Sequence, residues 1–338
     1  MKNSIAVIIP VYNTEKYLAE SLDSVLQQTW TNLTVFAVND GSTDRSAEIL
    51  DSYSKKDNRL KVIHKPNGGA SSARNVALDA IQNSGDQFDF IHFFDSDDLL
   101  ERTAYEYAIE SLNAYEANYV IFPILEFDKK GFTTEKEQTS FLVLEGQDEI
   151  ANFFFQTKAY FKKYYSFRAL GNKIFKADLF SNLRFNTALK TTEDQDVFLR
   201  LLPNLKKGVT VPNQFFYYRL RKSSLVRSTA MNGNLHVFSE LHFNPLCDYT
   251  EATNTLIFND YVKALVNSYL FAVSNNSPTA DVLAKEAKTV LTQTRYPISK
   301  AMKRKLYQCL LPRVLASLYV KYRINKKMRN KQNPNYFD

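Results

Sequence analysis

Short apolar runs and segments with helical spacing alternate along the first 130 residues, and this alternation constrains the fold more than any other feature of the chain. The runs are apolar at successive positions rather than at every second one, which is typical of strands buried on both faces. Strand, helix and strand in this order predict a mostly parallel sheet with helices on both sides. Strands are expected at 5–11, 33–38, 60–64, 88–94 and 119–127, and helices at 17–26, 42–53, 71–81 and 103–112.

The pattern changes twice farther along the chain. From about 131 to 220 it is less regular, with strands expected at 141–144 and 209–219 and helices at 148–156 and 194–202. Beyond about residue 234 helical patterns dominate, at 259–273 and 280–291. We therefore expect an α/β domain over 1–232, built from halves of about 1–130 and 131–232, and a helical region over 233–338.

Positive charge is concentrated at the C-terminal end of the chain. The formal net charge is +7, but residues 287–337 contain many lysines and arginines and no acidic residue, so the rest of the chain is mildly acidic. This asymmetry suggests an anionic surface as a partner. Between 307 and 329 the cations are interleaved with apolar residues at helical spacing, which predicts a basic amphipathic helix.

The basic helix has two open interpretations. Its apolar face can lie on an anionic membrane, which would place a cytoplasmic protein at the inner face of the cell membrane. The same face can instead pack on the α/β domain or on another subunit of an oligomer. Nucleic acid is a poorer partner, because no recognition motif accompanies the charge.

Cysteine usage and hydropathy limit the cellular compartments in which the chain is expected. Cys247 and Cys309 are far apart and have no partners at metal-ligand spacing, which indicates a reducing compartment without a disulfide framework. The chain start has no cleavage site for a signal peptide, and no uncharged apolar stretch approaches the roughly 18 residues that span a bilayer.

Two of the predicted buried strands end in carboxylates. Asp40 follows the strand at 33–38, and Asp95, Asp97 and Asp98 follow the strand at 88–94. Ligands bind at the carboxyl ends of strands in open α/β sheets, so we expect both groups to reach one cleft. Three neighbouring carboxylates repel one another unless a cation or donors intervene, and Mg²⁺ and Mn²⁺ favour such oxygen ligands together with substrate phosphates. The alternative is a turn that caps the next helix.

Two helix starts also carry candidate residues. Gly68 and Gly69 allow backbone N–H groups to approach an anion, and Arg74 lies one turn into the following helix, where it can address a phosphate or a carboxylate. Glu193 and Asp194 lie in the first turn of the helix expected at 194–202. Ordinary helix termini explain both segments as well, the second one through Thr191 or Thr192 with the nearby acids.

Taken in order, five motifs resemble glycosyltransferase family 2, the inverting enzymes of GT-A fold. They are Val7-Ile8-Ile9-Pro10-Val11-Tyr12-Asn13, Asn39-Asp40-Gly41-Ser42-Thr43-Asp44, Asn67-Gly68-Gly69 with Ala73-Arg74-Asn75, Asp95-Ser96-Asp97-Asp98 and Glu193-Asp194. The resemblance covers roughly residues 4 to 220 and is closest to bacterial enzymes that make surface polysaccharides and teichoic acids. It implies a Rossmann-like sheet flanked by helices. It also implies transfer of a sugar from a nucleotide diphosphate, a UDP-sugar, with Mn²⁺ or Mg²⁺, to a hydroxyl of a glycan or lipid-linked acceptor.

On the donor side, the resemblance implies roles for five residues. Pro10, Tyr12 and Asp40 would border the nucleobase, with Asp40 accepting a hydrogen bond from a uracil-like N–H. Asn67 and Arg74 would hold the nucleoside and the diphosphate.

For the metal and the acceptor, the resemblance implies a second set. Asp95 would touch the ribose and the metal, and Asp97 would ligate the metal, with Asp98 assisting. Asp194 would be the general base, with Glu193 beside it at the acceptor. One carboxylate about 3 Å from the acceptor hydroxyl suffices to take its proton as it attacks.

Four further residues have less specific signals. Arg219 and Arg221 follow a predicted strand and either reach the diphosphate or belong to a solvated loop. His64 and His92 lie in apolar strands, and we interpret them as core histidines rather than metal ligands.

Two alternative functions deserve comparison. A sugar nucleotidyltransferase shares the nucleotide crevice and the metal, but it would carry a Gly-rich basic loop after the first strand, where this chain reads Pro10-Val11-Tyr12-Asn13-Thr14. A catalytically silent member of the family would act as an assembly partner. The aspartates at 40, 95, 97 and 194 argue against this second alternative.

Overall fold

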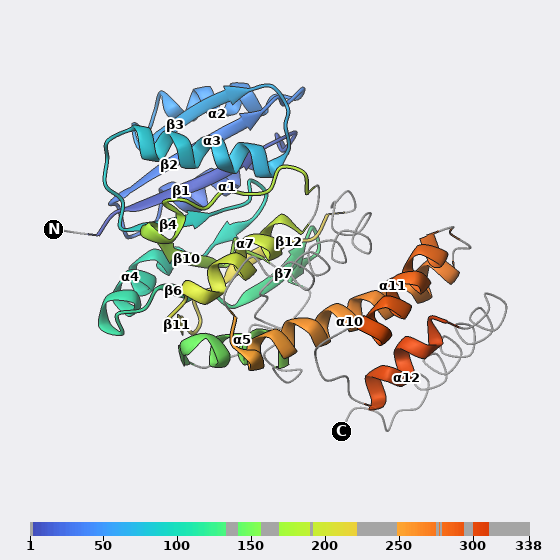
Figure 1. Cartoon of the computed structure of the whole chain (residues 1–338). Helices are drawn as coiled ribbons and strands as arrows, with labels where there is room; N and C mark the ends of the chain where they lie inside the picture. Colours follow the sequence, from blue (N-terminus) through green and yellow to red (C-terminus); the bar gives the residue numbers. More distant parts are fainter. Residues whose placement is uncertain are drawn as a thin grey trace. The chain divides into compact units, whose positions relative to one another are not determined.

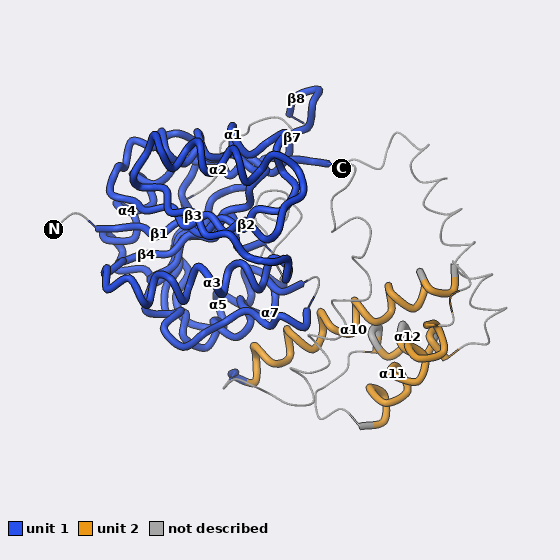
Figure 2. The backbone as a smooth tube through the Cα atoms, turned by 90° about the horizontal axis from the view of Figure 1, so that it is seen from above, with its two compact units in different colours: residues 1–228, 246–250 blue, residues 229–245, 251–338 orange. Residues whose placement is uncertain are grey.

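The computed structural model describes residues 3–132, 141–156, 169–189, 192–221, 249–274, 277, 279–293 and 300–310 (Figure 1). The chain divides into two compact units, residues 1–228 with 246–250 and residues 229–245 with 251–338 (Figure 2). The boundary expected near residue 232, Cys247 and the part of the basic helix beyond residue 310 lie outside the described residues.

The first unit is built on an eight-stranded sheet with the strand order β3-β2-β1-β4-β10-β6-β11-β9. Its N-terminal half is parallel: β1 (Ile5–Val11) pairs with β2 (Leu33–Asp40) and β4 (Phe90–Phe93), and β2 pairs with β3 (Leu60–Lys65). β1 is buried along almost its whole length, as its continuous apolarity predicted. The four strands expected up to residue 94 are confirmed to within two residues.

Helices cover both faces of this sheet, as Figure 2 shows. On one face lie α1 (Leu18–Leu26), α2 (Ser46–Ser54) and α4 (Ala104–Ala114), whose apolar side chains share a core with the odd-numbered residues of β1. On the other face lie α3 (Ala70–Asn83), α5 (Gly146–Gln156) and α7 (Glu193–Leu201). The helices expected at 17–26, 42–53, 71–81 and 103–112 are therefore confirmed, with small shifts at their ends.

The second half of the large sheet is mixed rather than parallel. β11 (Lys207–Thr210) is parallel to β6 (Tyr119–Ile121), but β10 (Lys173–Lys176) and β9 (Val143–Glu145) run antiparallel to their neighbours. The sequence analysis missed β10, which lies between β4 and β6. Because β10 runs opposite to β4, its first residue lies beside the end of β4. This direction brings the residues before β10 to the edge where the aspartates follow β4.

Two expected strands are each divided between two sheets. The run at 119–127 breaks before Pro123 into β6 and β7 (Ile124–Asp128), and the run at 209–219 breaks around Pro212 into β11 and β12 (Phe216–Arg219). Proline has no N–H for a ladder hydrogen bond, so it favours the end of a strand. The second sheet has the order β5-β12-β7-β8, with β5 at Leu99–Leu100 and β8 at Gly131–Phe132. Short 3-10 turns occur at Ala177–Phe180 and Leu202–Asn204.

The second unit is helical where it is described. It contains α10 (Glu251–Ser274), α11 (Thr279–Gln293) and α12 (Lys300–Gln308), so the helices expected at 259–273 and 280–291 are confirmed. Tyr261, Leu265 and Tyr269 of α10 are buried, as are Ala287 and Val290 of α11. No helix among the described residues is long and apolar enough to cross a membrane.

Candidate active site

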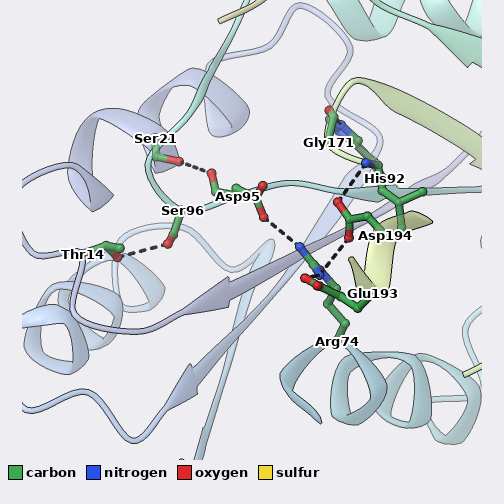
Figure 3. A network of polar contacts seen from close by, with 10 residues as sticks. Thr14, Ser21, Arg74, His92, Asp95, Ser96, Gly171, Glu193 and Asp194 are labelled. Carbon is green, nitrogen blue, oxygen red and sulfur yellow. Dashed lines mark hydrogen bonds and ion pairs between the residues drawn. The ribbon is translucent and has the colours of Figure 1, made fainter. Parts of the chain in front are cut away.

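Arg74, one turn into α3, joins three carboxylates from distant parts of the chain. Its Nη1 lies 2.9 Å from Glu193 Oε1 and 3.0 Å from Asp194 Oδ1, and its Nη2 lies 3.0 Å from Asp95 Oδ1. Figure 3 shows Arg74 reaching Asp95 on one side and Glu193 and Asp194 on the other. Burial alone would lower the pKa of the guanidinium, but the three acids hold that pKa above its usual range. Three of the predicted site carboxylates, Asp95, Glu193 and Asp194, therefore meet on one cation.

The Asn75 side chain fixes the backbone of Phe185, which precedes Glu193 and Asp194 in the chain, close to Arg74. Asn75, next to Arg74 in α3, donates from Nδ2 to the Phe185 carbonyl at 2.9 Å and accepts the Phe185 N–H at 2.7 Å. The ring of Phe185 also lies 5.3 Å from the Arg74 guanidinium. This two-bond clamp ties the segment that precedes α7 to α3.

The start of α7 differs from the expected capped terminus. Thr192 has a φ of 69° and makes no side-chain capping hydrogen bond, and Thr191 lies outside the described residues. A left-handed conformation is unfavourable for a β-branched residue, and such strain is concentrated at functional sites. The strained residue comes directly before Glu193 and Asp194.

Asp194 is a mostly buried carboxylate, with 16% of its side chain exposed, and it has few strong hydrogen bonds. Its Oδ2 accepts the Leu170 N–H at 3.1 Å, while its buried Oδ1 has the ionic contact with Arg74 but no well-directed hydrogen bond. Burial raises the pKa of Asp194 to about 7, with the negative charges of Glu193 and Asp95 adding to the rise and Arg74 opposing it. A carboxylate whose pKa lies near neutrality is suited to take and return a proton.

The loop after β4 holds the other three aspartates. Asp95 is the most exposed of them, and its backbone carbonyl accepts from the Ser21 hydroxyl at 3.3 Å. Thr14 donates to the buried Ser96 hydroxyl at 3.1 Å, which fixes the loop on its other side. Burial raises the pKa of Asp97 to about 6, against the opposing charge of Arg221. Burial also raises the pKa of Asp98 well above its usual range, together with the charge of Asp97.

Arg219 and Arg221 both contact this loop. Arg221 Nε lies 2.5 Å from Asp97 Oδ2, and Arg219 donates from Nε to the Asp97 carbonyl at 2.7 Å. The Arg219 guanidinium lies over the ring of Phe127 at 4.4 Å and over that of Tyr17 at 5.0 Å. Neither arginine is part of a solvated loop: Arg219 anchors the end of β12, and Arg221 neutralises Asp97.

Asp40 occupies a separate, fully bonded position at the end of β2. Its Oδ1 accepts the Gly68 N–H at 2.9 Å, its Oδ2 accepts the Gly69 N–H at 2.7 Å, and Lys65 forms an ion pair with it. Asn67 donates to the Asp40 carbonyl at 3.0 Å. The anion that the two glycine amides approach is therefore the Asp40 carboxylate.

Pro10 lies on β1, the strand that pairs with the Asp40 strand, and Tyr12 comes directly after β1. Pro10 pairs with Val38 in the β1–β2 ladder and is partly buried, whereas Tyr12 follows the strand and is 50% exposed. A half-exposed aromatic side chain at the carboxyl edge of the sheet is available to a ligand.

The aspartates fit a divalent cation in part. Among the described residues, no group of three or more His, Cys, Asp or Glu side chains is arranged to hold a metal ion. Mg²⁺ commonly binds through one or two carboxylates plus substrate phosphates, so Asp95 and Asp97 supply a fitting donor set for a cation that a diphosphate completes. Asp98 fits less well, because it is 1% exposed and its Oδ1 accepts the Arg219 N–H at 2.8 Å.

The two histidines differ from each other. His92 is a core residue, as expected: its Nε2 donates to the Gly171 carbonyl at 2.7 Å, and its Nδ1 accepts from the Tyr105 hydroxyl at 2.9 Å. Burial lowers its pKa to about 4. His64 is not a core residue, because its side chain is half exposed and pairs with Asp51 at 3.0 Å.

Three residues of this site were not singled out from the sequence. Leu170 contributes only its backbone N–H, and Phe185 acts through its backbone and ring, so neither has a readable signal. Lys173 did have one: it is a lysine at the start of the short segment Lys173-Ile174-Phe175-Lys176, which forms an interior strand.

Comparison with known proteins gives a family and several relatives. A family model described as Glycosyl transferase family 2 matches residues 6–184. Glycosyltransferase GlyA of Streptococcus pneumoniae serotype 4 is 30% identical over 264 residues, which are 76% of this chain and 35% of GlyA. Glycosyltransferase GlyG of the same organism is 28% identical over 243 residues, 68% of this chain and 74% of GlyG. The minor teichoic acid biosynthesis protein GgaB of Bacillus subtilis is 28% identical over 247 residues, 71% of this chain and 26% of GgaB.

Solved structures share the fold. S. aureus TarS 1–349 in complex with UDP superposes with a TM-score of 0.66 at 20% identity, covering 99% of this chain and 94% of that chain. Mannosyltransferase PcManGT from Pyrobaculum calidifontis, in complex with GDP-Man and Mn²⁺, superposes with a TM-score of 0.55 at 16% identity, covering 94% of this chain and 88% of that chain. The expected GT-A fold, a central sheet flanked by helices with a helical C-terminal region, is confirmed.

Proposed function

Because the chain belongs to glycosyl transferase family 2, we propose that it transfers a sugar from a nucleotide diphosphate to a hydroxyl of a glycan or lipid-linked acceptor during synthesis of a cell-surface glycan. The observation that carries the proposal is the contact of Arg74 with Asp95 on the donor side and Asp194 on the acceptor side. The relatives named glycosyltransferases and the teichoic acid protein GgaB support it. The UDP complex of TarS supports a UDP-sugar as the donor.

In the proposed reaction Asp194 is the general base. The acceptor oxygen forms a bond to the anomeric carbon while the bond from that carbon to the diphosphate oxygen breaks, and the diphosphate leaves with the electron pair. The acceptor proton passes to the Asp194 carboxylate. Attack from the face opposite the diphosphate inverts the anomeric centre. A divalent cation, when bound by Asp95, Asp97 and the donor phosphates, would stabilise the charge that develops on the diphosphate.

Arg74 connects the two halves of this reaction. Its positive charge favours the ionised form of Asp194, which is the form that accepts a proton, and it orients Asp95 next to the donor. Because one guanidinium bridges both carboxylates, a small movement of α3 would displace the base and the donor ligand together. Placement of reacting groups to within about 1 Å is worth roughly a hundredfold in rate. Glu193 completes this contact and would face the acceptor.

The remaining predicted residues would bind the donor. Tyr12, Pro10 and Asn67 surround the bonded Asp40 group and would border the nucleobase and nucleoside. Asp40 itself would offer its carboxylate to a base N–H only by sharing oxygens that Gly68, Gly69 and Lys65 already use. Arg221 would turn from Asp97 to the diphosphate once a cation neutralises that aspartate.

A donor screen tests the proposal. Release of nucleotide from UDP-, GDP- and dTDP-sugars is measured with and without Mn²⁺ and Mg²⁺, and binding of UDP with Mn²⁺ is measured by calorimetry. We expect metal-stimulated turnover of a UDP-sugar. A protein that binds none of the three nucleotides with either metal would contradict the proposal, and would instead favour the silent assembly partner.

The basic C-terminal segment leads to a separate proposal about location. We propose that the basic segment at 307–329 holds the enzyme at an anionic membrane, where lipid-linked acceptors are found. Flotation with liposomes of neutral lipid and of one-third anionic lipid compares the native chain with a variant in which Lys326, Lys327 and Arg329 are changed to Glu. Equal partitioning of both proteins would favour packing on protein instead.

A further inference from the structure

Two buried basic side chains hold the four-residue turn Ala169-Leu170-Gly171-Asn172 that lies against Asp194. Lys173 Nζ donates to the Ala169 carbonyl at 2.6 Å and to Asn172 Oδ1 at 2.8 Å. His92 Nε2 donates to the Gly171 carbonyl at 2.7 Å. Between these two anchored carbonyls lies the Leu170 N–H, which donates to Asp194 Oδ2 at 3.1 Å. The turn is thus fixed on both sides of the one amide that contacts the base.

The environment of Lys173 is unusual for a lysine. Its side chain is fully buried at the start of β10, and its ammonium lies 5.4 Å from the ring centre of Phe154 and 5.5 Å from that of Phe198. A buried charge is costly unless it is paired or hydrogen-bonded, whereas a methionine or leucine would fill this aromatic space without that cost. Hydrogen bonds and two aromatic rings stabilise the Lys173 ammonium, so we ask which function of the protein needs a positive charge here.

The charge of Lys173 bears on the protonation of Asp194. Burial lowers the pKa of Lys173 to about 7, and the negative charge of Asp194 raises it again. Lys173 is linked to Asp194 through the turn that carries the Leu170 N–H, while Arg74 contacts Asp194 directly from α3. Glu193 on α7 and Asp95 after β4 contribute negative charge. Two cations therefore oppose two neighbouring anions around the base.

We propose that Lys173 is a positioning residue for Asp194: its ammonium closes the 169–172 turn, aims the Leu170 N–H at the carboxylate, and supplies a second positive charge that favours the ionised base. This proposal rests on the proposed function only where it concerns catalysis. The proposed link between Lys173 and Asp194, through the Leu170 turn and through charge, does not require that Asp194 is the base.

Lys173→Met tests the catalytic part, because methionine keeps the length and apolar character of the side chain and removes its charge. We expect kcat to fall roughly 10- to 100-fold with the donor KM nearly unchanged, since no donor residue is altered. We also expect the acidic limb of the pH profile of kcat/KM to move to higher pH, because Asp194 loses a cation. Lys176→Met on the same strand is the matched control and should leave both the rate and the profile as they are. A folded Lys173→Met protein with a native profile would overturn the proposal.

A second measurement needs no change at Lys173. In protein labelled with ¹³C at the lysine side chains, the signal that titrates apart from the other lysines is followed with pH in the native chain and in Asp194→Asn. The asparagine keeps an oxygen for the Leu170 N–H but has no charge, so we expect the midpoint of that signal to fall. An identical midpoint in both proteins would overturn the coupling. If the coupling is present but Asp194→Asn transfers sugar normally, Asp194 is not the general base, and the coupling between Lys173 and Asp194 is retained.

Discussion

Asp40 and Asp194 are both buried carboxylates with a basic partner, yet their surroundings differ in one decisive respect. Asp40 accepts two backbone N–H groups, one on each oxygen, and has its own lysine, Lys65. Asp194 accepts one backbone N–H and shares Arg74 with two other acids. Both Asp40 oxygens accept hydrogen bonds from the protein, whereas Asp194 Oδ1 has only its ionic contact with Arg74 and no well-directed hydrogen bond. The comparison teaches that the first carboxylate organises two loops and the second is poised to bind a proton.

The largest expected effect is the loss of catalysis that the substitution Asp194→Asn causes. Asparagine keeps the shape and the bond from Leu170 but has no basic oxygen, so we expect kcat to fall roughly 10³-fold, within the range for loss of a general base. Affinity for UDP, measured by calorimetry, should stay native. Turnover at the native rate would remove Asp194 from the reaction and break the comparison.

The same comparison predicts opposite effects on stability. Asp40→Asn leaves Lys65 without its buried partner, and we expect the free energy of unfolding to drop by about 3 kcal/mol. Asp194 has a raised pKa, so its ionised form destabilises the fold as pH rises through about 7. Asp194→Asn should therefore be as stable as the native chain or more stable at pH 8. Urea unfolding of both variants at pH 8 measures these free energies. A larger loss of stability in Asp194→Asn than in Asp40→Asn would show that Asp194, and not Asp40, is the carboxylate that stabilises the fold.

The pH dependence of activity sharpens the role of Asp194. The carboxyl is protonated below its pKa of about 7 and is then unable to act as a base. We expect kcat/KM to fall about tenfold for each pH unit below that value and to level off above it. The profile is measured between pH 5.5 and 8.5 with buffers of constant ionic strength. A rate that stays level down to pH 5.5 would be inconsistent with this base.

The smallest expected effect concerns the loops that Asp40 organises. Gly41 has a φ of 69°, and a Cβ there would lie 2.7 Å from the Asn67 backbone nitrogen. Gly85 has a φ of 75° and open space around it, so it is a matched control for backbone strain alone. We expect Gly85→Ala to cost about 1 kcal/mol of stability and Gly41→Ala about 1–2 kcal/mol more. Equal losses of stability in the two variants would show that the loops with Gly41 and Asn67 separate at little cost in free energy.

Much of the fold was predictable because local pattern decides it. Continuous apolar runs predicted the ends of the parallel strands β1 to β4 to within two residues, and helical spacing located α1, α3 and α11 closely. The helix α10 begins at Glu251, well before the start expected at residue 259. β10 was missed because its four residues carry two lysines, one of which is buried. The runs at 119–127 and 209–219 were expected to be single strands, although each contains a proline and its two halves pair in different sheets.

The sequence predicted which residues form the candidate site, but it did not predict which of them contact one another. Asp95, Asp97, Glu193, Asp194 and Arg74 were all identified from motifs, and the structure brings Asp95, Glu193 and Asp194 together on Arg74. The anion at the Gly68-Gly69 turn proved to be a carboxylate of the protein itself. The contributions of Leu170 and Phe185 come from backbone atoms, which every residue carries and no motif marks.

By itself, the sequence determined which segments become strands or helices and which acidic side chains follow the strands, because these depend on neighbours within a few residues. Only the tertiary structure decided which cation each carboxylate meets. Arg74 and Glu193 are 119 positions apart, and β10, which runs antiparallel to β4, brings the turn with the Leu170 amide to Asp194. Charge interactions depend on distance and burial, and both are set by long-range packing that no local pattern specifies.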